Sequence, residues 1–360
     1  MEPKWKNSSK TSVFVFNVGR GLAVFIRTPS NHGIIYDLGS SDDFKPSDFL
    51  KEHILPHLSK FEDKQNEKRA LMQRIISHPH LDHISEIEIL ETPTFDAGLH
   101  TCPHDKDKIN ASECSENINW SRINNPGNQK DKIEIYKSLY AKRNPPLQTP
   151  KMPTSVTQEF VESGLYYLRP TKVDKIFPSE DQEYTNGISL VYYYKHAQNT
   201  ILIPGDINPD AFRVLLNDYP GSEKRYSTND GSNPDWTEKN SNQPKLGDRL
   251  KQGLSILIAP HHGLESGYSE DLYEMIKDNK PDLVVISEKR HTGPNDGSIH
   301  SNYQSGNGAK GLKVEIEGKE EIKYSVSTRN NHHILITFSG NSSEPKVFLE
   351  KDPKLLLEKM

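Results

Sequence analysis

The stretch SHPHLDHISE, Ser77–Glu86, places three histidines and one aspartate within six positions. It follows the apolar segment ALMQRII, residues 70–76, which predicts a β-strand. It leads into LDHISEIEIL, residues 81–90, whose apolar spacing and acidic start predict a helix. The motif therefore lies where a strand ends and a helix begins. Ligands bind at such junctions in folds that combine sheet and helix.

Further polar groups follow short apolar segments in the same manner. Each of these segments predicts a strand, and the groups that follow them are Asp37, Asp206, the pair His261 and His262, and the loop histidines His291 and His300. Because ligands gather beyond strand ends, we expect these groups to converge although they lie far apart in the sequence. The competing interpretation is structural: a polar loop at the motif, a helix N-cap at Asp206, and exposed loop histidines further on.

The side chains in these clusters are donors that suit a transition metal. Imidazole and carboxylate together favour Zn²⁺, and the same donors accept Mn²⁺. Two such ions about 3.5–4 Å apart can hold a bridging hydroxide as the nucleophile and stabilise the developing charge. His78 and His80 project from one tight loop toward one ion, and Asp82 with His83 can serve the second. Asp206 is the natural bridge between them.

The remaining sequence predicts sheet interrupted by polar insertions. Three β-rich segments within residues 13–39 indicate an antiparallel meander. We expect one domain, whose parts are a core at residues 12–340, a polar insertion or cap at 95–157, a loop or disordered insertion at 220–246, and a charged tail at 341–360. His332 and His333, which begin the last predicted strand, are expected on the surface.

The composition excludes several functional classes. The chain has 360 residues and a net charge of -5, so no general positive field attracts nucleic acid or anionic membrane. The two cysteines, Cys102 and Cys114, are too few for a disulfide framework or a cysteine-based zinc ribbon. No apolar run approaches the ~20 residues that span a bilayer, and the N-terminus lacks a signal-like segment. We expect a cytoplasmic protein without membrane contact.

The motif HPHLDH, residues 78–83, resembles the HxHxDH signature of the metallo-β-lactamase superfamily. Five blocks resemble, in order, those of its ComEC-type branch, named for the hydrolase domain attached to the competence DNA channel. They are VFNVGRGLAVFIRTPSNHGIIYDLGS, SHPHLDHI, NGISLVYYYKHAQNTILIPGDI, LIAPHHG and PDLVVISEKR with a later histidine. The likeness is to the hydrolase domain only. It implies an α/β fold, a four-layer αββα sandwich with polar insertions and metal at its edge.

The resemblance also implies roles for individual residues. The metal ligands it implies are His78, His80, Asp82, His83, Asp206, His262 and His300. The catalytic residues it implies are Asp82, Asp206, His261 and His300. Two choices stay open: which of His261 and His262 is the ligand, with His262 favoured, and whether His291 or His300 completes the site. Asp37 is expected to support the motif loop without binding metal.

Three features depart from the family pattern. The branch usually has VGQGD where this chain has VGRGL, with Arg20 and Leu22 in place of glutamine and aspartate. Many branch members lack a histidine at the position of His80. Related enzymes also take a histidine from before the GD strand, and the candidates here are His100, His104 and His196. We expect His196 to be a solvated turn residue, and His261 or His262 to supply the missing ligand.

The residues and the resemblance together predict a metal-dependent hydrolase with two divalent ions, with Zn²⁺ preferred and Mn²⁺ as the alternative. The ComEC-type resemblance implies that a bridging hydroxide attacks a phosphodiester in a nucleic acid, a nucleotide or a phosphocholine-like head group, as in a phosphodiesterase or nuclease. Hydrolysis of a carboxylic ester, thioester or lactam is the alternative reaction. A metal-stabilised binding or regulatory partner without turnover, whose insertions contact another protein, is the alternative from a different class.

Overall fold

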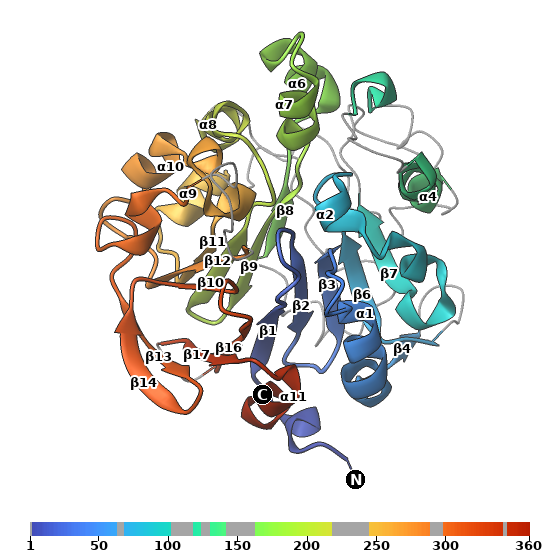
Figure 1. Cartoon of the computed structure of the whole chain (residues 1–360), viewed down its shortest axis with the longest axis vertical. Helices are drawn as coiled ribbons and strands as arrows, with labels where there is room; N and C mark the ends of the chain where they lie inside the picture. The colour runs from blue at the N-terminus through green and yellow to red at the C-terminus, as the bar shows by residue number, and fades with distance from the viewer. Residues whose placement is uncertain are drawn as a thin grey trace, which may run out of the picture.

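The computed structural model describes residues 2–62, 68–101, 118–123, 130–141, 163–217, 245–288, 298–340 and 344–360. Within them the chain forms two large sheets with helices outside (Figure 1). The nine-stranded sheet has the order β14-β13-β17-β16-β1-β2-β3-β6-β7, and the six-stranded sheet has the order β15-β12-β11-β10-β9-β8. A short ribbon of β4 (Phe61–Glu62) and β5 (Lys68–Arg69) is separate.

The strands of the nine-stranded sheet are β1 (Thr11–Val15), β2 (Ala23–Arg27), β3 (Gly33–Leu38), β6 (Leu71–Ile75), β7 (Ala97–Thr101), β13 (Leu312–Ile316), β14 (Lys319–Lys323), β16 (His333–Phe338) and β17 (Lys346–Glu350). Those of the six-stranded sheet are β8 (Gly164–Tyr166), β9 (Val191–His196), β10 (Asn199–Ile203), β11 (Ile256–Ile258), β12 (Leu283–Ile286) and β15 (Ser325–Ser327). The predicted meander is confirmed, because β1, β2 and β3 pair antiparallel in sequence order.

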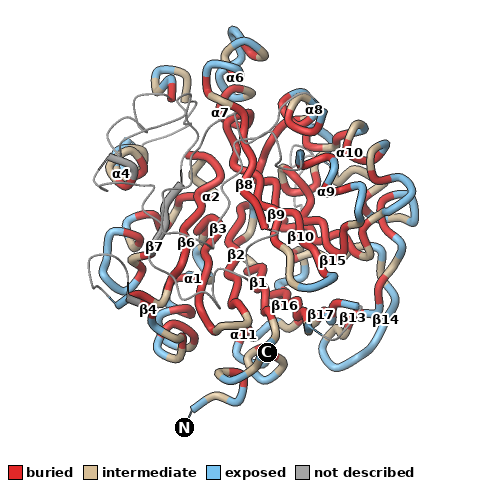
Figure 2. Tube along the Cα trace, turned by 180° about the vertical axis from the view of Figure 1, so that it is seen from behind, coloured by how far each residue is buried: buried red, intermediate tan, exposed pale blue. Residues whose placement is uncertain are grey.

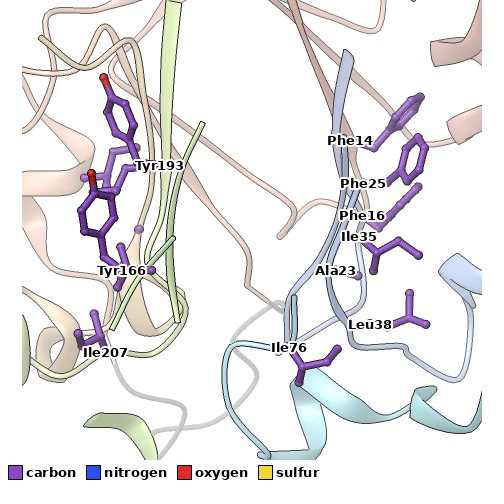
Figure 3. Packing of buried hydrophobic residues seen from close by; sticks show 14 of the residues in the cluster. Phe14, Phe16, Ala23, Phe25, Ile35, Leu38, Ile76, Tyr166, Tyr193 and Ile207 are labelled. Carbon is purple, nitrogen blue, oxygen red and sulfur yellow. The ribbon is translucent and has the colours of Figure 1, made fainter. Parts of the chain in front are cut away.

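Alternate side chains of the central strands fill two different apolar layers. Val13 and Val15 of β1 enter the layer between the sheets, together with Ile201 and Ile203 of β10. Phe14 of β1 instead faces the outer layer beneath the helices. Figure 3 shows Phe14 and Phe25 pointing away from the opposite sheet, while Tyr166 and Tyr193 of that sheet point the other way. Because strand side chains alternate between faces, the central strands of both sheets are buried on two sides, whereas the edge strand β14 is exposed.

Helices cover the outer faces of both sheets. The described α-helices are α1 (Pro46–Phe49), α2 (Leu81–Ile84), α4 (Lys130–Ala141), α6 (Pro170–Ile176), α7 (Asp181–Gly187), α8 (Pro209–Asn217), α9 (Leu246–Leu250), α10 (Glu270–Met275) and α11 (Pro353–Leu356). Helix α8 shows why they pack there: its residues Ala211, Phe212, Leu215 and Leu216 are buried, and Val214 is partly buried against the same core. Figure 2 shows buried strands at the centre and exposed helix faces outside. No helix in the described part of the chain is both long and apolar enough to cross a bilayer.

Two predicted boundaries differ from the structure. The insertion predicted at 95–157 begins with β7, which pairs parallel with β6 and extends the sheet, and it also contains α4. The tail predicted at 341–360 contains β17, which pairs antiparallel with β16. The charges of Lys346 and Glu350 at its two ends obscured this strand, although Val347 and Leu349 within it are buried. Most of the 220–246 insertion lies outside the described residues.

Three histidines expected on the surface are more enclosed than predicted. His332 and His333 are 8% and 4% exposed, because β17 covers the strand that they begin. His332 contacts Glu317, with 2.8 Å between Nε2 and Oε1. His196 does lie at the turn between β9 and β10, but it is half-buried, and its Nδ1 lies 3.1 Å from Thr11 Oγ1.

The burial of His333 predicts a pH-dependent loss of stability. Its Nδ1 accepts the backbone N–H of Asn17 at 3.2 Å, and burial lowers its pKa to about 4. Between pH 6.5 and 4, His333 is protonated in the unfolded chain but stays neutral in the folded chain. The free energy of unfolding therefore falls as the pH falls toward 4. The expected contribution is at most ~3 kcal/mol. Urea denaturation from pH 7 to 4 should show a smaller loss in His333→Asn; equal losses in both proteins would contradict the prediction.

Candidate metal centre

The site forms where parallel strands of both sheets end. Strands β3 and β6 run parallel in one sheet, and β10, β11, β12 and β15 run parallel in the other. Backbone hydrogen bonds join these segments. Leu190 N donates to Ser77 O at 3.0 Å between the two sheets, and His261 N donates to Gly205 O at 3.1 Å within the six-stranded sheet. The polar clusters predicted to converge therefore do so at Asp37, the motif, Asp206 and the histidine pair.

Asp37 holds the motif loop from behind. Its carboxylate accepts hydrogen bonds from Ser77 N at 2.6 Å and Ser77 Oγ at 2.7 Å. The other contact is with His83 Nδ1, 2.7 Å from Asp37 Oδ2. This contact places the Nδ1 proton of His83 toward Asp37 and leaves Nε2 facing the site. The supporting role that the resemblance implied for Asp37 agrees with this geometry.

Asp206 enters the site through a close approach of the two sheets. It follows Gly205, whose φ is +60° and whose position leaves no room for a side chain. A Cβ there would lie 2.8 Å from Ser77 Cβ and 3.0 Å from Tyr36 Oη. The N-cap of α8 is Asn208, whose Oδ1 accepts Ala211 N at 3.1 Å. The capping role considered for Asp206 is thus taken by Asn208, and the Asp206 carboxylate faces histidines.

The histidine pair lies in a strained turn after β11. His261 and His262 have φ of 48° and 58°, in the left-handed region that side chains rarely adopt. His262 is 5% exposed and directs Nδ1 toward Ser287 O at 3.0 Å, which leaves Nε2 facing the site. Ser287 in turn donates from Oγ to Gly21 O at 2.5 Å. The strain is thus held by contacts from two other strand ends.

Two groups of potential ligands share Asp206. One group consists of Asp82, His83, Asp206 and His262, and the other of His78, His80 and Asp206, each with its ligand atoms within 4.8 Å of one another. In the first group, His83 Nε2 lies 3.2 Å from Asp206 Oδ1 and His262 Nε2 lies 3.4 Å from Asp206 Oδ2. In the second, His78 Nε2 lies 2.9 Å from His80 Nδ1. These buried groups could bind a metal ion.

Two buried imidazole nitrogens of the site also have the environment expected of metal ligands. His83 Nε2 and His262 Nε2 are buried and have no hydrogen-bond partner among the described residues. Buried polar atoms without partners are rare and need an explanation such as a missing ion. Both atoms face Asp206, and His262 Nε2 also lies 3.3 Å from Asp82 Oδ2. A transition-metal ion between these atoms would satisfy them all.

The carboxylates of the group that contains Asp82, His83, Asp206 and His262 favour positive charge at this position. Burial raises the pKa of Asp206, but His262, His83 and His261 outweigh it and hold that pKa well below its usual range. Burial lowers the pKa of His262, but Asp206 and Asp82 raise it to about 9. Without metal, protons on these imidazoles balance the carboxylates. Metal binding would displace those protons.

The second group has the opposite balance. Burial lowers the pKa of His78 well below its ordinary value, with the positive charges of His83 and His80 acting in the same direction. Burial also lowers the pKa of His80. Both imidazoles are thereby favoured in the neutral form, which is the form that ligates metal.

The other predicted site residues are placed differently. His261 belongs to neither group, although its Nε2 lies 3.9 Å from Asp206 Oδ2 and its Nδ1 lies 3.0 Å from Ser266 Oγ. His300 also lies outside both groups. His291 and His104 lie outside the described residues, and the backbone of His100 lies in β7 opposite Arg74. His262, which was favoured as the ligand of the histidine pair, lies with Asp82 and His83 and not with His78 and His80.

Sequence reasoning missed the residues that position the candidate ligands. Ser77 and Ser287 contact candidate ligand histidines, and Gly21 and Gly39 pack against the carbonyl of Asp82. Leu22 N also donates to Asp82 O at 3.2 Å. The glycines of VGRGL were the available signal, but they were used only for comparison with the family pattern. Leu22 contacts Asp82 through its backbone N–H. This contact is therefore kept although leucine replaces the aspartate of the family pattern.

No protein-family model and no curated protein matches this sequence. The chain is therefore defined by its fold and its site: a mixed α/β protein with two mixed sheets and buried His/Asp groups that could bind metal.

The unequal donor sets predict that metal binds in two steps. The group containing Asp82 offers four donors, whereas His78 and His80 share only Asp206 as their third. We expect Zn²⁺ titrated into metal-free protein to give two calorimetric phases separated by at least about tenfold in Kd, or ~1.4 kcal/mol. His80→Ala should remove the weaker phase alone, and His196→Ala should remove neither. Two equal phases, or loss of the tighter one in His80→Ala, would contradict this.

Proposed function

We propose that the protein is a metal-dependent hydrolase of the metallo-β-lactamase fold, with two divalent ions and a phosphodiester substrate. The observation that carries the proposal is that Asp206 belongs to both ligand groups. A carboxylate shared in this way can bridge two ions, and paired ions suit displacement at phosphorus.

The arrangement of the fold supports the family assignment. Two sheets pack face to face with helices outside, as expected of an αββα sandwich. The HPHLDH motif follows β6, the GD pair follows β10, and the HHG turn follows β11. This order and these positions are those that the resemblance to the ComEC-type branch implies.

The residues divide the work of the proposed reaction. His78 and His80 would hold one ion, Asp82, His83 and His262 the other, and Asp206 both. When bound, the ions would supply a hydroxide nucleophile and neutralise developing negative charge. Asp37 orients His83, and Ser287 orients His262. His261, whose Nε2 faces Asp206 and whose side chain is 19% exposed, is positioned to pass a proton to the leaving group.

The preference for phosphodiesters rests on the family resemblance. A net charge of -5 neither supplies nor forbids a local basic surface for nucleic acid. The same metal centre could cleave carboxylic esters, thioesters or lactams, so the substrate class has to be measured.

The test is an elemental analysis followed by a substrate comparison. We expect about two equivalents of Zn²⁺ or Mn²⁺ per chain in purified protein. Loaded protein should release nitrophenol from bis(p-nitrophenyl) phosphate faster than from p-nitrophenyl acetate, and a chelator should abolish the release. DNA, RNA and cyclic nucleotides would then narrow the class. Turnover of the acyl substrate alone would overturn the phosphodiester assignment, and protein that binds no metal would overturn the whole proposal.

A further inference from the structure

A third histidine element adjoins the metal centre. The backbone N–H of His300 donates to the carbonyl of Gly263 at 3.0 Å, and Gly263 directly follows the candidate ligand His262. An isolated antiparallel bridge also pairs Leu264 with Ile299. The chain around His300 is therefore fastened to the turn that carries the histidine pair, which places His300 at the rim of the site.

The proton of the neutral His300 ring is located by its neighbours. His300 is the N-cap of the 3₁₀-helix η9 (Ser301–Gln304), and its Nδ1 accepts the backbone N–H of Asn302 at 3.3 Å. A ring nitrogen that accepts a hydrogen bond carries no proton, so the proton lies on Nε2. For a metal to bind Nε2, the proton would have to move to Nδ1, where it would face the N–H of Asn302 and break this hydrogen bond.

The plane of the His300 ring is fixed by aromatic stacking. Tyr268 lies 3.5 Å away between ring centroids, at an interplanar angle of 6°. Tyr268 in turn stacks on Tyr273 at 5.1 Å and 17°. Asn302 closes the arrangement, because its Nδ2 donates to Tyr268 Oη at 2.8 Å. The imidazole is thus held in one orientation before any substrate arrives.

The Nε2–H of His300 points toward a carboxylate but makes no hydrogen bond with it. It faces the carboxylate of Glu265, with 3.6 Å between Nε2 and Oε2, which is longer than a hydrogen bond. The Glu265 side chain is 59% exposed, so it can turn to solvent when another acceptor arrives. Glu265 also belongs to the loop that holds His261, since Ser266 next to it contacts His261.

We propose that His300 is a substrate-binding hydrogen-bond donor and not a metal ligand, with Glu265 and Tyr268 as its positioning residues. This inference rests on the proposed phosphodiester hydrolysis. The anionic oxygens of a phosphodiester accept hydrogen bonds strongly, and the Nε2–H at the rim donates to one of them. Donation at an oxygen that gains charge during the reaction contributes to turnover as well as to binding.

The test compares His300→Asn with the wild-type protein. Asparagine is a favoured N-cap residue, so it retains an acceptor for the Asn302 N–H while placing no donor at the Nε2 position. We expect elemental analysis to find the same metal content in both proteins. The value of kcat/KM for bis(p-nitrophenyl) phosphate should fall by about 10²-fold in the variant. His300→Gln, whose amide N–H extends farther, should restore part of the loss.

Two positioning variants and one control complete the comparison. Tyr268→Leu removes the stack and should lower kcat/KM without changing the metal content, while Tyr268→Phe retains the stack and most of the activity. His196→Asn, at the far end of its strand from Asp206, should change neither quantity.

The outcomes distinguish three roles for His300: metal ligand, helix cap and substrate donor. Loss of metal in His300→Asn would show that His300 is a ligand and overturn the proposal. Unchanged turnover in that variant would show that His300 only caps η9, and it would also overturn the proposal. If wild-type protein hydrolyses no diester, the proposed function fails and the donor role fails with it. If wild-type protein hydrolyses the diester and His300→Asn matches it, only the donor role fails.

Discussion

Replacing Asp206 by asparagine is expected to remove both the catalytic activity and most of the metal. Asp206 belongs to both ligand groups, and it is 3% exposed among histidines that carry unpaired Nε2 atoms. Asparagine has the same size but a neutral oxygen, which cannot bridge two cations as a carboxylate does. We expect kcat/KM for a diester to fall by at least about 10³-fold, or ~4 kcal/mol of transition-state stabilisation. Elemental analysis should find less than one ion per chain.

The matched control is Asp210→Asn, four residues along the same segment. Asp210 is 57% exposed and pairs with Arg213 on the surface of α8, so its replacement should leave activity and metal content unchanged. If Asp206→Asn retained two ions and full turnover, the shared-carboxylate assignment would be wrong. If it retained two ions and lost turnover, Asp206 would act in chemistry without binding metal.

Replacing Gly39 by alanine is expected to weaken both the fold and the metal centre. A Cβ at Gly39 would lie 2.2 Å from Asp82 O and 3.0 Å from Leu22 O. Gly21, whose φ is +149°, approaches the same Asp82 carbonyl, and a Cβ there would lie 2.5 Å away from it. Both clashes are with backbone, so no side-chain rotation relieves them. The peptide that carries Asp82 must move, and its carboxylate with it.

The expected size of the Gly39→Ala effect comes from overpacking and from ligand displacement. We expect the free energy of unfolding in urea to fall by about 1–3 kcal/mol. The apparent Zn²⁺ affinity should fall by about 10–100-fold, as it does when residues that orient a ligand are changed. Gly306→Ala is the control, because the nearest atom to its Cβ would be 3.6 Å away, an ordinary contact. Wild-type Zn²⁺ affinity in Gly39→Ala would show that the close approach does not position Asp82.

Local sequence patterns predicted the elements that carry the candidate ligands. Short β-rich segments ending in polar residues predicted β3, β6, β10 and β11, and each is present. Such segments are readable because apolar side chains on both faces of a buried strand leave a continuous run in the sequence. The C-terminal strand β17 was missed, since Lys346 and Glu350 at its two ends make it look like part of a charged tail. That error also placed His332 and His333 on the surface.

The assignment of donors to groups could not be made from the sequence. Spacing within the motif predicted that His78 and His80 act together, but His262 could have joined either group. Its place beside Asp82 and His83 depends on the turn held by Ser287, a residue at the end of another strand. The separation of His300 from both groups likewise depends on its stacking with Tyr268, which is remote in sequence.

The linear order of residues was sufficient to predict the candidate donor residues and the strand ends that carry them, because both depend on neighbouring residues and on side-chain periodicity. The packing of the two sheets was needed to show that Asp206 lies between two sets of imidazoles, that Asn208 caps α8 in its place, and that two glycines pack against the carbonyl of Asp82. These relations depend on distances of a few ångströms between segments far apart in the chain, and no local pattern encodes them.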